Sequence, residues 1–271
     1  MDWLIYLNGF AVMLVLATVT WLLSLYLRDV SIVDSAWSIM FLGAAYIYFT
    51  QSPLTELRET IVFLLVLIWA LRLSAHLTWR NWGEPEDRRY QAIREKYVPN
   101  FAIKSLFIIF IFQAVIAWVV SLSLVTAFQR PALVTGISLL DIMGILLWLT
   151  GMLFESIADW QLAKFKNNPE NQGKVMQTGL WKFSRHPNYF GECLIWWGFY
   201  LFALNNGAWW SIVSPLIMTW LLLKFSGVVM LEQTITTRRP DYLQYQKRTN
   251  AFFPGLPKKI VTEQYPKGHT S

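Results

Sequence analysis

Long runs of apolar residues, each close to the length that crosses a lipid bilayer, constrain this chain more than any other feature. A helix needs roughly 20 apolar residues to span the hydrocarbon core of a membrane. Seven segments meet or approach that length: 3–27, 31–50, 60–79, 105–127, 137–163, 189–205 and 208–231. The sequence therefore predicts an all-α, multi-pass integral membrane protein with about seven transmembrane helices.

The composition agrees with this class. Only 15% of the 271 residues are charged, where a soluble domain has about a quarter. The first apolar run lacks a basic segment before it and a small-residue cleavage site after it, so we interpret it as a retained helix rather than a signal peptide. A single cysteine, Cys193, makes no intramolecular disulfide, and with only three scattered histidines we expect no metal site.

The positions of the basic residues predict the orientation of the helices. With the amino terminus outside and the carboxy terminus in the cytoplasm, 19 of the 23 lysines and arginines fall on the cytoplasmic side. Only Arg58 and Arg130 fall in outer loops. Such a bias is typical of multi-pass membrane proteins. We therefore attribute the net charge of +6 to topology and do not expect nucleic-acid binding.

Ionisable side chains at membrane depth are costly, and each is a functional candidate. These are Asp34, Arg72, Asp141, Glu155, Asp159, Glu192, Lys224 and Glu232. Asp34 suits either an exposed first-turn carboxylate or an acid in the membrane, and Arg72 can extend to water. Asp141 suits the positive dipole end of the fifth helix. Glu155, Asp159 and Lys166 share one helix face, which fits either a structural ion pair or a polar ligand site.

The stretch "SRHPNYFGE", residues 184–192, gathers hydrogen-bonding groups immediately before an apolar segment. Pro187 suits an early helix position because the first backbone N–H groups of a helix have no internal partner. Asn188 and Glu192 are four apart and share a helix face, while Arg185 and His186 lie in the preceding turn. This pattern predicts a polar cup at a helix N-terminus, where anions and polar ligands bind readily.

Several motifs together resemble a known family. "RHPNYFGE", the tail "RRPDYLQYQKRTNAFFP" and the upstream motifs "VDSAW" and "WALRLSAHLTWR" are similar to the steroid 5-alpha-reductase superfamily, including its sterol reductases and a bacterial multi-pass branch. The resemblance covers about residues 30–258. It implies a membrane-embedded reductase in which NADPH binds from the cytoplasm and a lipophilic substrate enters from the bilayer.

The resemblance also implies residue roles. Asn188 and Glu192 match the positions that hold the nicotinamide side of the cofactor. The remaining positions expected to contact the cofactor are Arg72, Asp159, Lys166, Arg185, His186, Arg239, Tyr242 and Tyr245. We expect Lys166, Arg185 and Arg239 to neutralise its phosphates.

The catalytic pair of the family is incomplete in this chain. Steroid reductases polarise the substrate ketone with a glutamate and a tyrosine; Asp34 is the nearest candidate for the carboxylate, and Trp69 stands at the tyrosine position. The resemblance implies an oxidoreductase acting on CH–CH donors, like a 3-oxo-5-alpha-steroid 4-dehydrogenase, with Asp34 and Trp69 as catalytic candidates and Asp34 as the proton donor. Because an indole N–H is no acid, either the electrophilic group has moved or the substrate is not a 3-oxo-4-ene steroid.

Two alternatives stay open. Isoprenylcysteine carboxyl methyltransferases and related phospholipid methyltransferases have a similar loop and tail and bind S-adenosylmethionine; Glu232 would match their tail glutamate. The chain could instead be a non-enzymatic lipid-binding membrane protein, which would account for the missing tyrosine.

The organisation that we expect is one transmembrane domain, residues 1–258, whose carboxy-terminal half 137–258 carries the cofactor motif, followed by a polar tail, 259–271. Expected partners are membrane lipids and a lipophilic substrate from the bilayer. A bacterial inner membrane fits best, with the endoplasmic reticulum as the other option. The substrate and the oligomeric state stay open.

Overall fold

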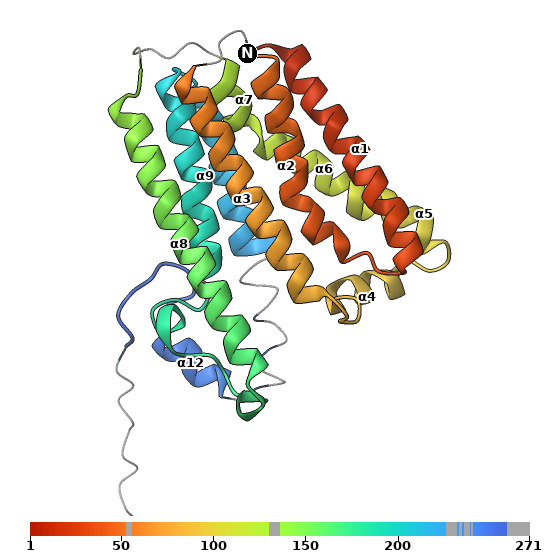
Figure 1. Ribbon diagram of the computed structural model, residues 1–271. Helices are drawn as coiled ribbons and strands as arrows, with labels where there is room; N and C mark the ends of the chain where they lie inside the picture. Colours follow the sequence, from red (N-terminus) through yellow and green to blue (C-terminus); the bar gives the residue numbers. More distant parts are fainter. Residues whose placement is uncertain are drawn as a thin grey trace, which may run out of the picture. The chain divides into compact units, whose positions relative to one another are not determined.

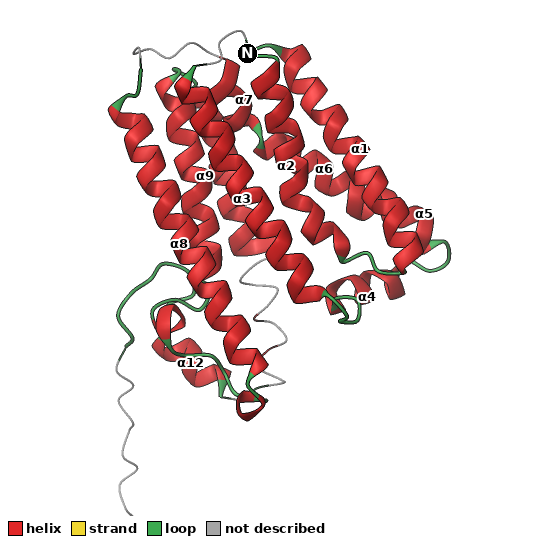
Figure 2. Ribbon diagram, in the orientation of Figure 1, coloured by secondary structure: helices red, strands yellow, loops and turns green. Residues whose placement is uncertain are grey.

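The computed structural model describes residues 1–52, 56–129, 136–225, 232, 235, 239 and 241–258. Within these residues the chain forms helices and loops and no strand, which confirms the all-α prediction (Figure 2). The predicted polar tail, 259–271, and Arg130 lie outside the described residues. The principal helices (Figure 1) are α1 (Trp3–Leu27), α2 (Ile32–Thr50), α3 (Leu57–Asn81), α4 (Arg88–Lys96), α5 (Phe101–Ser105), α6 (Phe112–Val120), α7 (Leu122–Gln129), α8 (Leu139–Asn167), α9 (Pro187–Asn205), α10 (Val213–Trp220) and α12 (Tyr242–Arg248).

Five helical segments of the described chain are long and apolar enough to cross a membrane: α1, α2, α3, Phe101–Val120 and α8. They correspond to the first five predicted segments. The sixth forms α9, whose 19 residues include Asn188 and Glu192 and which is not among these five segments. The seventh forms a shorter apolar segment, Trp209–Lys224. The chain is thus a multi-pass membrane protein with five such helices in its described part.

The chain divides into two compact units. Unit 1 comprises Met1–Met152 and Cys193–Thr219, and unit 2 comprises Leu153–Glu192 and Trp220–Ser271. In unit 1, α1 packs against α2 and α2 packs against α3, as Figure 1 shows. Helix α6 contacts both α1 and α2, and α7 contacts α2 and α3. The segment between α5 and α6, Leu106–Ile111, is π-helical, a geometry that often marks functional sites.

Aromatic side chains fill the core of unit 1. Trp69 on α3 and Trp196 on α9 meet edge to face, with ring centroids 5.5 Å apart. Phe41 packs on both rings, and all three side chains are fully buried. Trp69, a catalytic candidate from the sequence, therefore belongs to a packed aromatic cluster.

Two glycines let α8 and α9 approach closely inside unit 1. A Cβ atom on Gly198 would lie 2.8 Å from the carbonyl oxygen of Gly144, so a larger residue would force the helices apart. Small residues at such crossings are typical of helices that pack within membranes.

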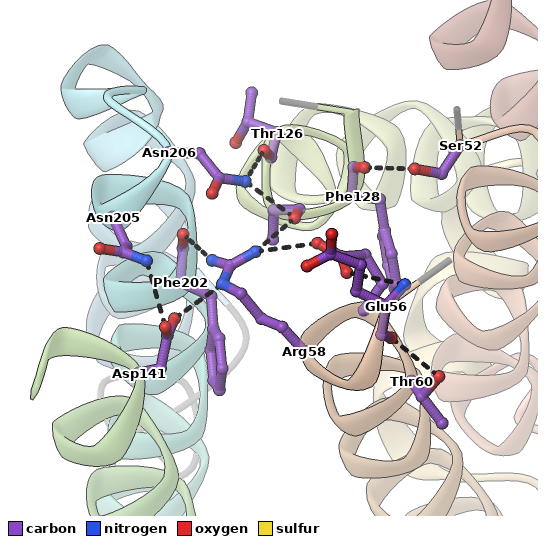
Figure 3. A network of polar contacts seen from close by, with 12 residues as sticks. Ser52, Glu56, Arg58, Thr60, Thr126, Phe128, Asp141, Phe202, Asn205 and Asn206 are labelled. Carbon is purple, nitrogen blue, oxygen red and sulfur yellow. Dashed lines mark hydrogen bonds and ion pairs between the residues drawn. The ribbon is translucent and has the colours of Figure 1, made fainter. Parts of the chain in front are cut away.

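A buried arginine at the start of α3 connects the ends of three other helices of unit 1 (Figure 3). Arg58 is only 2% exposed. Its Nε donates a hydrogen bond of 2.9 Å to Oδ1 of Asp141, in the first turn of α8. Its two Nη atoms donate to the carbonyl of Ala127 near the end of α7 and to that of Phe202 near the end of α9. The sequence prediction that Arg58 lies in an outer loop is therefore wrong.

Neighbouring side chains complete this network. Asn205 donates to Oδ2 of Asp141 at 3.1 Å, and Asn206 donates to the carbonyls of Thr126 and Ala127, both at 2.9 Å (Figure 3). Asp141 and Ser138 also bond each other's backbone N–H and so cap α8, which confirms the predicted helix-start position. Helix ends leave backbone groups without internal partners, and lipid offers them none. The network supplies those partners inside the protein.

We expect Arg58→Met to lower the free energy of unfolding by about 3–5 kcal/mol, because it leaves the Asp141 carboxylate buried without its cation. Equilibrium unfolding in detergent micelles, followed by tryptophan fluorescence, measures this change. The double variant Arg58→Met/Asp141→Leu should be no less stable than Arg58→Met, since the unpaired charge is also removed.

Arg88→Met is the matched control, because Arg88 is exposed on α4. Its effect should stay within about 0.5 kcal/mol. A loss for Arg58→Met as small as that of the control would refute the role assigned to the buried guanidinium.

Candidate cofactor site

All the predicted cofactor residues except Arg72 lie in unit 2. The core of this unit fixes the loop after α8 onto the helix: Trp181 packs with Ala158 and donates to its carbonyl at 3.0 Å. Gly179, with φ +60°, allows a further contact, since a Cβ there would lie 2.4 Å from the Gln161 side chain. Gln161 in turn accepts from the backbone N–H of Leu180 at 3.0 Å. The loop that leads into the "RHPNYFGE" motif is thus held rigidly against α8.

Helix α9 begins at Pro187, as the motif predicted. Asn188 and Glu192 consequently lie one turn apart on it. The side-chain amide of Asn188 donates to Oδ1 of Asp159 on α8 at 3.1 Å. The carboxyl-bearing residues Asp159 and Glu192 are each 7% exposed. Unit 2 therefore brings two predicted cofactor residues, Asp159 and Asn188, into direct contact beside a helix N-terminus.

A second cluster, here called the Glu232 cluster, consists of Glu232, Arg185, His186, Tyr242 and Gln246. Arg185 bonds both carboxylate oxygens of Glu232, at 2.7 and 2.8 Å. His186 Nε2, the Tyr242 hydroxyl and the Gln246 amide lie at 3.0 Å from the same carboxylate. One carboxylate thus joins the loop before α9 to the carboxy-terminal helix α12.

The electrostatics of the Glu232 cluster favour the ionised carboxylate. Burial alone would raise the pKa of Glu232, but hydrogen bonds from His186 and Arg185 and the Arg185 charge hold that pKa far below its usual range. For Tyr242, burial and the neighbouring Glu232 charge raise the pKa well above that of a free phenol. The cluster is therefore an anion surrounded by hydrogen-bond donors, of which Arg185 and Tyr242 stay protonated at neutral pH.

The rest of the carboxy-terminal segment wraps around the same loop. Tyr245 donates its hydroxyl to the carbonyl of Trp181, and Ser184 donates to the carbonyl of Phe252 at 2.7 Å. Arg185 Nη1 donates to the carbonyls of Gln246 and Thr249. Arg185, Tyr242 and Tyr245, all predicted to contact a cofactor, thus make internal bonds that hold the loop and the tail together.

Lys166 and Arg239 border a surface pocket of about 280 Å³ in unit 2. The other polar side chains of the lining are amides. The rest of the lining is Asn167, Asn168, Asn171 and Gln172, with Phe165, Pro169 and Gly173. Arg239 also donates to the carbonyl of Lys174 and so reaches the loop after α8. No carboxylate is among the described residues that line the pocket. Two cations and several amides form a surface suited to an anion.

The remaining predicted residues lie in unit 1. Arg72 and Trp69 are on α3, and Asp34 is in the first turn of α2. Asp34 accepts hydrogen bonds from Arg89 at 2.7 Å and from the Tyr90 hydroxyl at 2.6 Å. In both contacts Asp34 is the acceptor, so its predicted role as proton donor stays a prediction.

Tyr90 is a candidate that the sequence reasoning missed. It is buried on α4, and Gln113 on α6 donates to its oxygen at 3.2 Å. Burial, followed by the Asp34 charge, raises the pKa of Tyr90 well above the usual value. Tyr90 lies in the stretch "EDRRYQAIREKY", 56 positions after Asp34 in the chain, and no local pattern connects the two.

Comparison with known proteins identifies relatives without an assigned activity. A model of the family described as "Protein of unknown function (DUF1295)" matches residues 20–249. An uncharacterized protein of the yeast Schizosaccharomyces pombe is 26% identical over 293 aligned positions, which cover 92% of this chain and 79% of the yeast protein. No solved structure matches.

We expect Glu232→Gln to destabilise the protein by about 3 kcal/mol at neutral pH, because Arg185 loses its counter-charge. The pKa of Glu232 is depressed by folding, so this stabilisation is complete above the unfolded-state pKa of about 4.3 and is lost as the pH falls further. Thermal unfolding measures the difference in stability between the wild type and Glu232→Gln. This difference should be constant from pH 8 to about pH 4 and should become smaller between about pH 4 and pH 3.

Glu170→Gln, at an exposed glutamate of the same unit, controls for loss of charge alone. It should leave the stability within about 0.5 kcal/mol of the wild type. A stability difference between wild type and Glu232→Gln that becomes larger on acidification would contradict the stabilising role of the ionised Glu232 carboxylate.

Proposed function

The chain belongs to the DUF1295 family, and from this premise we propose that it is a membrane-embedded reductase that uses NADPH to reduce a carbon–carbon double bond of a lipophilic, steroid- or isoprenoid-like substrate. The proposal includes the wider resemblance to the steroid 5-alpha-reductase superfamily. It also includes seven membrane spans, an amino terminus outside and a cofactor site on the cytoplasmic side.

The pocket beside α8 is the observation that carries this proposal. Lys166 and Arg239 are positively charged, the other polar lining groups are amides, and the described lining holds no carboxylate. Such a donor set fits a phosphate group, and NADPH carries three. Both residues were expected to contact phosphates from the resemblance alone. We assign them that role, with Asn167 and Asn168 as neutral donors at the same pocket.

The same features favour NADPH over S-adenosylmethionine. S-adenosylmethionine offers one carboxylate and a sulfonium cation, whereas NADPH offers three phosphates to Lys166 and Arg239. Glu232, which would match the tail glutamate of the methyltransferases, accepts five hydrogen bonds from its own chain. Its carboxylate is therefore committed to the Glu232 cluster rather than to a cationic ligand.

The residues of unit 2 would have different roles in binding the cofactor. Bound NADPH supplies a hydride to the substrate. Asn188, at the N-terminus of α9, and the buried Glu192 and Asp159 would orient the nicotinamide end. Arg185 acts indirectly, because its guanidinium holds the loop to the tail.

In unit 1, Tyr90 is the group best suited to meet negative charge on a substrate oxygen. Its hydroxyl stays protonated at neutral pH, whereas the Trp69 ring is packed among Phe41, Trp196 and Phe199. The Tyr90 hydroxyl donates its hydrogen bond to Asp34, which Arg89 also holds. To protonate a substrate, Tyr90 would turn this single O–H from Asp34 to the substrate oxygen. We assign Tyr90 as the proton donor and Asp34 as the residue that positions it.

Calorimetry with the purified protein in detergent tests the cofactor. NADPH should bind, and S-adenosylmethionine should not. Lys166→Ala, Arg239→Ala, Asn188→Ala and Glu192→Ala should each weaken NADPH binding, by roughly 10- to 100-fold for the two cations, since a charge-assisted hydrogen bond contributes about 1.5–3 kcal/mol.

Lys164→Ala is the matched control for the cations. Lys164 lies in the last turn of α8, where it stacks on Trp160 rather than lining the pocket. Absence of NADPH binding to the intact protein, or equal affinities for the control and the Lys166 and Arg239 variants, would exclude the reductase proposal as stated.

Tyr90→Phe tests the assigned proton donor. With NADPH and steroid and isoprenoid enones in mixed micelles, the variant should form reduced product about 10²–10⁴ times more slowly, as expected for loss of a general acid. Its affinity for NADPH should match that of the wild type. Product formation, measured by mass spectrometry, at the wild-type rate would remove Tyr90 from the mechanism.

A further inference from the structure

Glu232 determines more than the stability of the loop, because it also fixes the protonation pattern of His186. The only ring atom of His186 with a hydrogen-bond partner among the described residues is Nε2, which lies 3.0 Å from Oε1 of Glu232. Arg185 pairs with both oxygens of that carboxylate, so the carboxylate is ionised and can only accept. The proton of this bond must therefore reside on Nε2.

A neutral imidazole with its proton on Nε2 presents Nδ1 as an acceptor. The ring is also fixed in orientation: it stacks on Tyr189, with centroids 5.6 Å apart and planes within 8° of parallel. Tyr189 lies in the first turn of α9. Glu232 and Tyr189 together leave His186 little freedom to rotate or to exchange tautomers.

The surroundings of His186 combine this acceptor with donors. Pro187, which has no N–H, follows it directly, and the first backbone N–H of α9 belongs to Asn188, whose side chain adds an amide. A ligand group that offers both an acceptor and a donor would satisfy this combination. A phosphate offers only acceptors, and so it does not match Nδ1.

We propose that Glu232 holds His186 as an Nε2–H tautomer whose Nδ1 accepts a hydrogen bond from the carboxamide N–H of the nicotinamide ring. This inference rests on the proposed use of NADPH. His186 is then a recognition residue for the neutral end of the cofactor, and Glu232 is its positioning residue. The carboxamide C=O would face the N–H groups at the start of α9.

Nitrogen NMR of protein labelled with ¹⁵N-histidine tests the first half of the proposal without any ligand. The chain has three histidines, His76, His186 and His269, so three ring systems give signals, and His186→Gln assigns the one of interest. At neutral pH His186 should show a protonated Nε2 and an unprotonated Nδ1. A protonated Nδ1 in the wild type would overturn the proposal.

Two nucleotides test the second half. The 3-acetylpyridine analogue of NADPH keeps the carbonyl but replaces the NH₂ group with CH₃, and so it cannot donate to Nδ1. It should bind the wild type roughly tenfold more weakly than NADPH, and only NADPH should shift the Nδ1 resonance. The fragment 2′,5′-ADP, which lacks nicotinamide, should not shift it.

The variant His186→Gln separates recognition from folding. Its amide nitrogen can take the place of Nε2 and keep the bond to Glu232, but it offers no counterpart of Nδ1. It should remain folded and bind NADPH and the acetylpyridine analogue with equal affinity.

The outcomes are distinguishable. If the wild type does not bind NADPH at all, the proposed function and the ligand half of this inference fall together, while the tautomer measurement still decides the role of Glu232. If NADPH binds but the analogue binds equally well to the wild type, only the assignment of His186 is overturned.

Discussion

The architecture of unit 1 depends on one guanidinium that lies where several helices end. A helix in lipid must pair every backbone group within the protein, and its last carbonyls have no partners of their own. Arg58 reaches the ends of α7 and α9 and the first turn of α8 from a single position on α3. Asp141 compensates its charge and caps α8 in turn. The ends of α7, α8 and α9 are therefore interdependent through side chains that an apolar residue could not replace.

Sequence alone predicted the features that depend on local pattern. The lengths of the apolar runs placed α1, α2, α3 and α8, because a membrane span is defined by consecutive residues. The sequence-based prediction misplaced Arg58. The partners that bury this side chain, Asp141 and Phe202, lie 83 and 144 residues away in the chain. The same reasoning interpreted Asp141 correctly as a helix start but could not show its full burial.

The candidate site was likewise predicted from the sequence only where it depends on local pattern. The motif predicted the start of α9 at Pro187 and the shared face of Asn188 and Glu192, since both follow from helical spacing. The partner of Arg185 was not predictable, because an arginine in a polar loop suits a phosphate as well as a carboxylate. The structure pairs it with Glu232, 47 residues later, and leaves the pocket at Lys166 and Arg239 as the better anion site.

The bonds between the loop and the carboxy-terminal segment set an order for biosynthesis. Ser184 bonds a carbonyl 68 residues later, and Phe183 accepts from the backbone of Gly255. While a ribosome is still adding those residues, the loop before α9 has already emerged but lacks its partners. The partly buried Arg185 must remain hydrated until the segment with α12 arrives. The part of the chain that carries the candidate site is therefore also the part that matures last during translation.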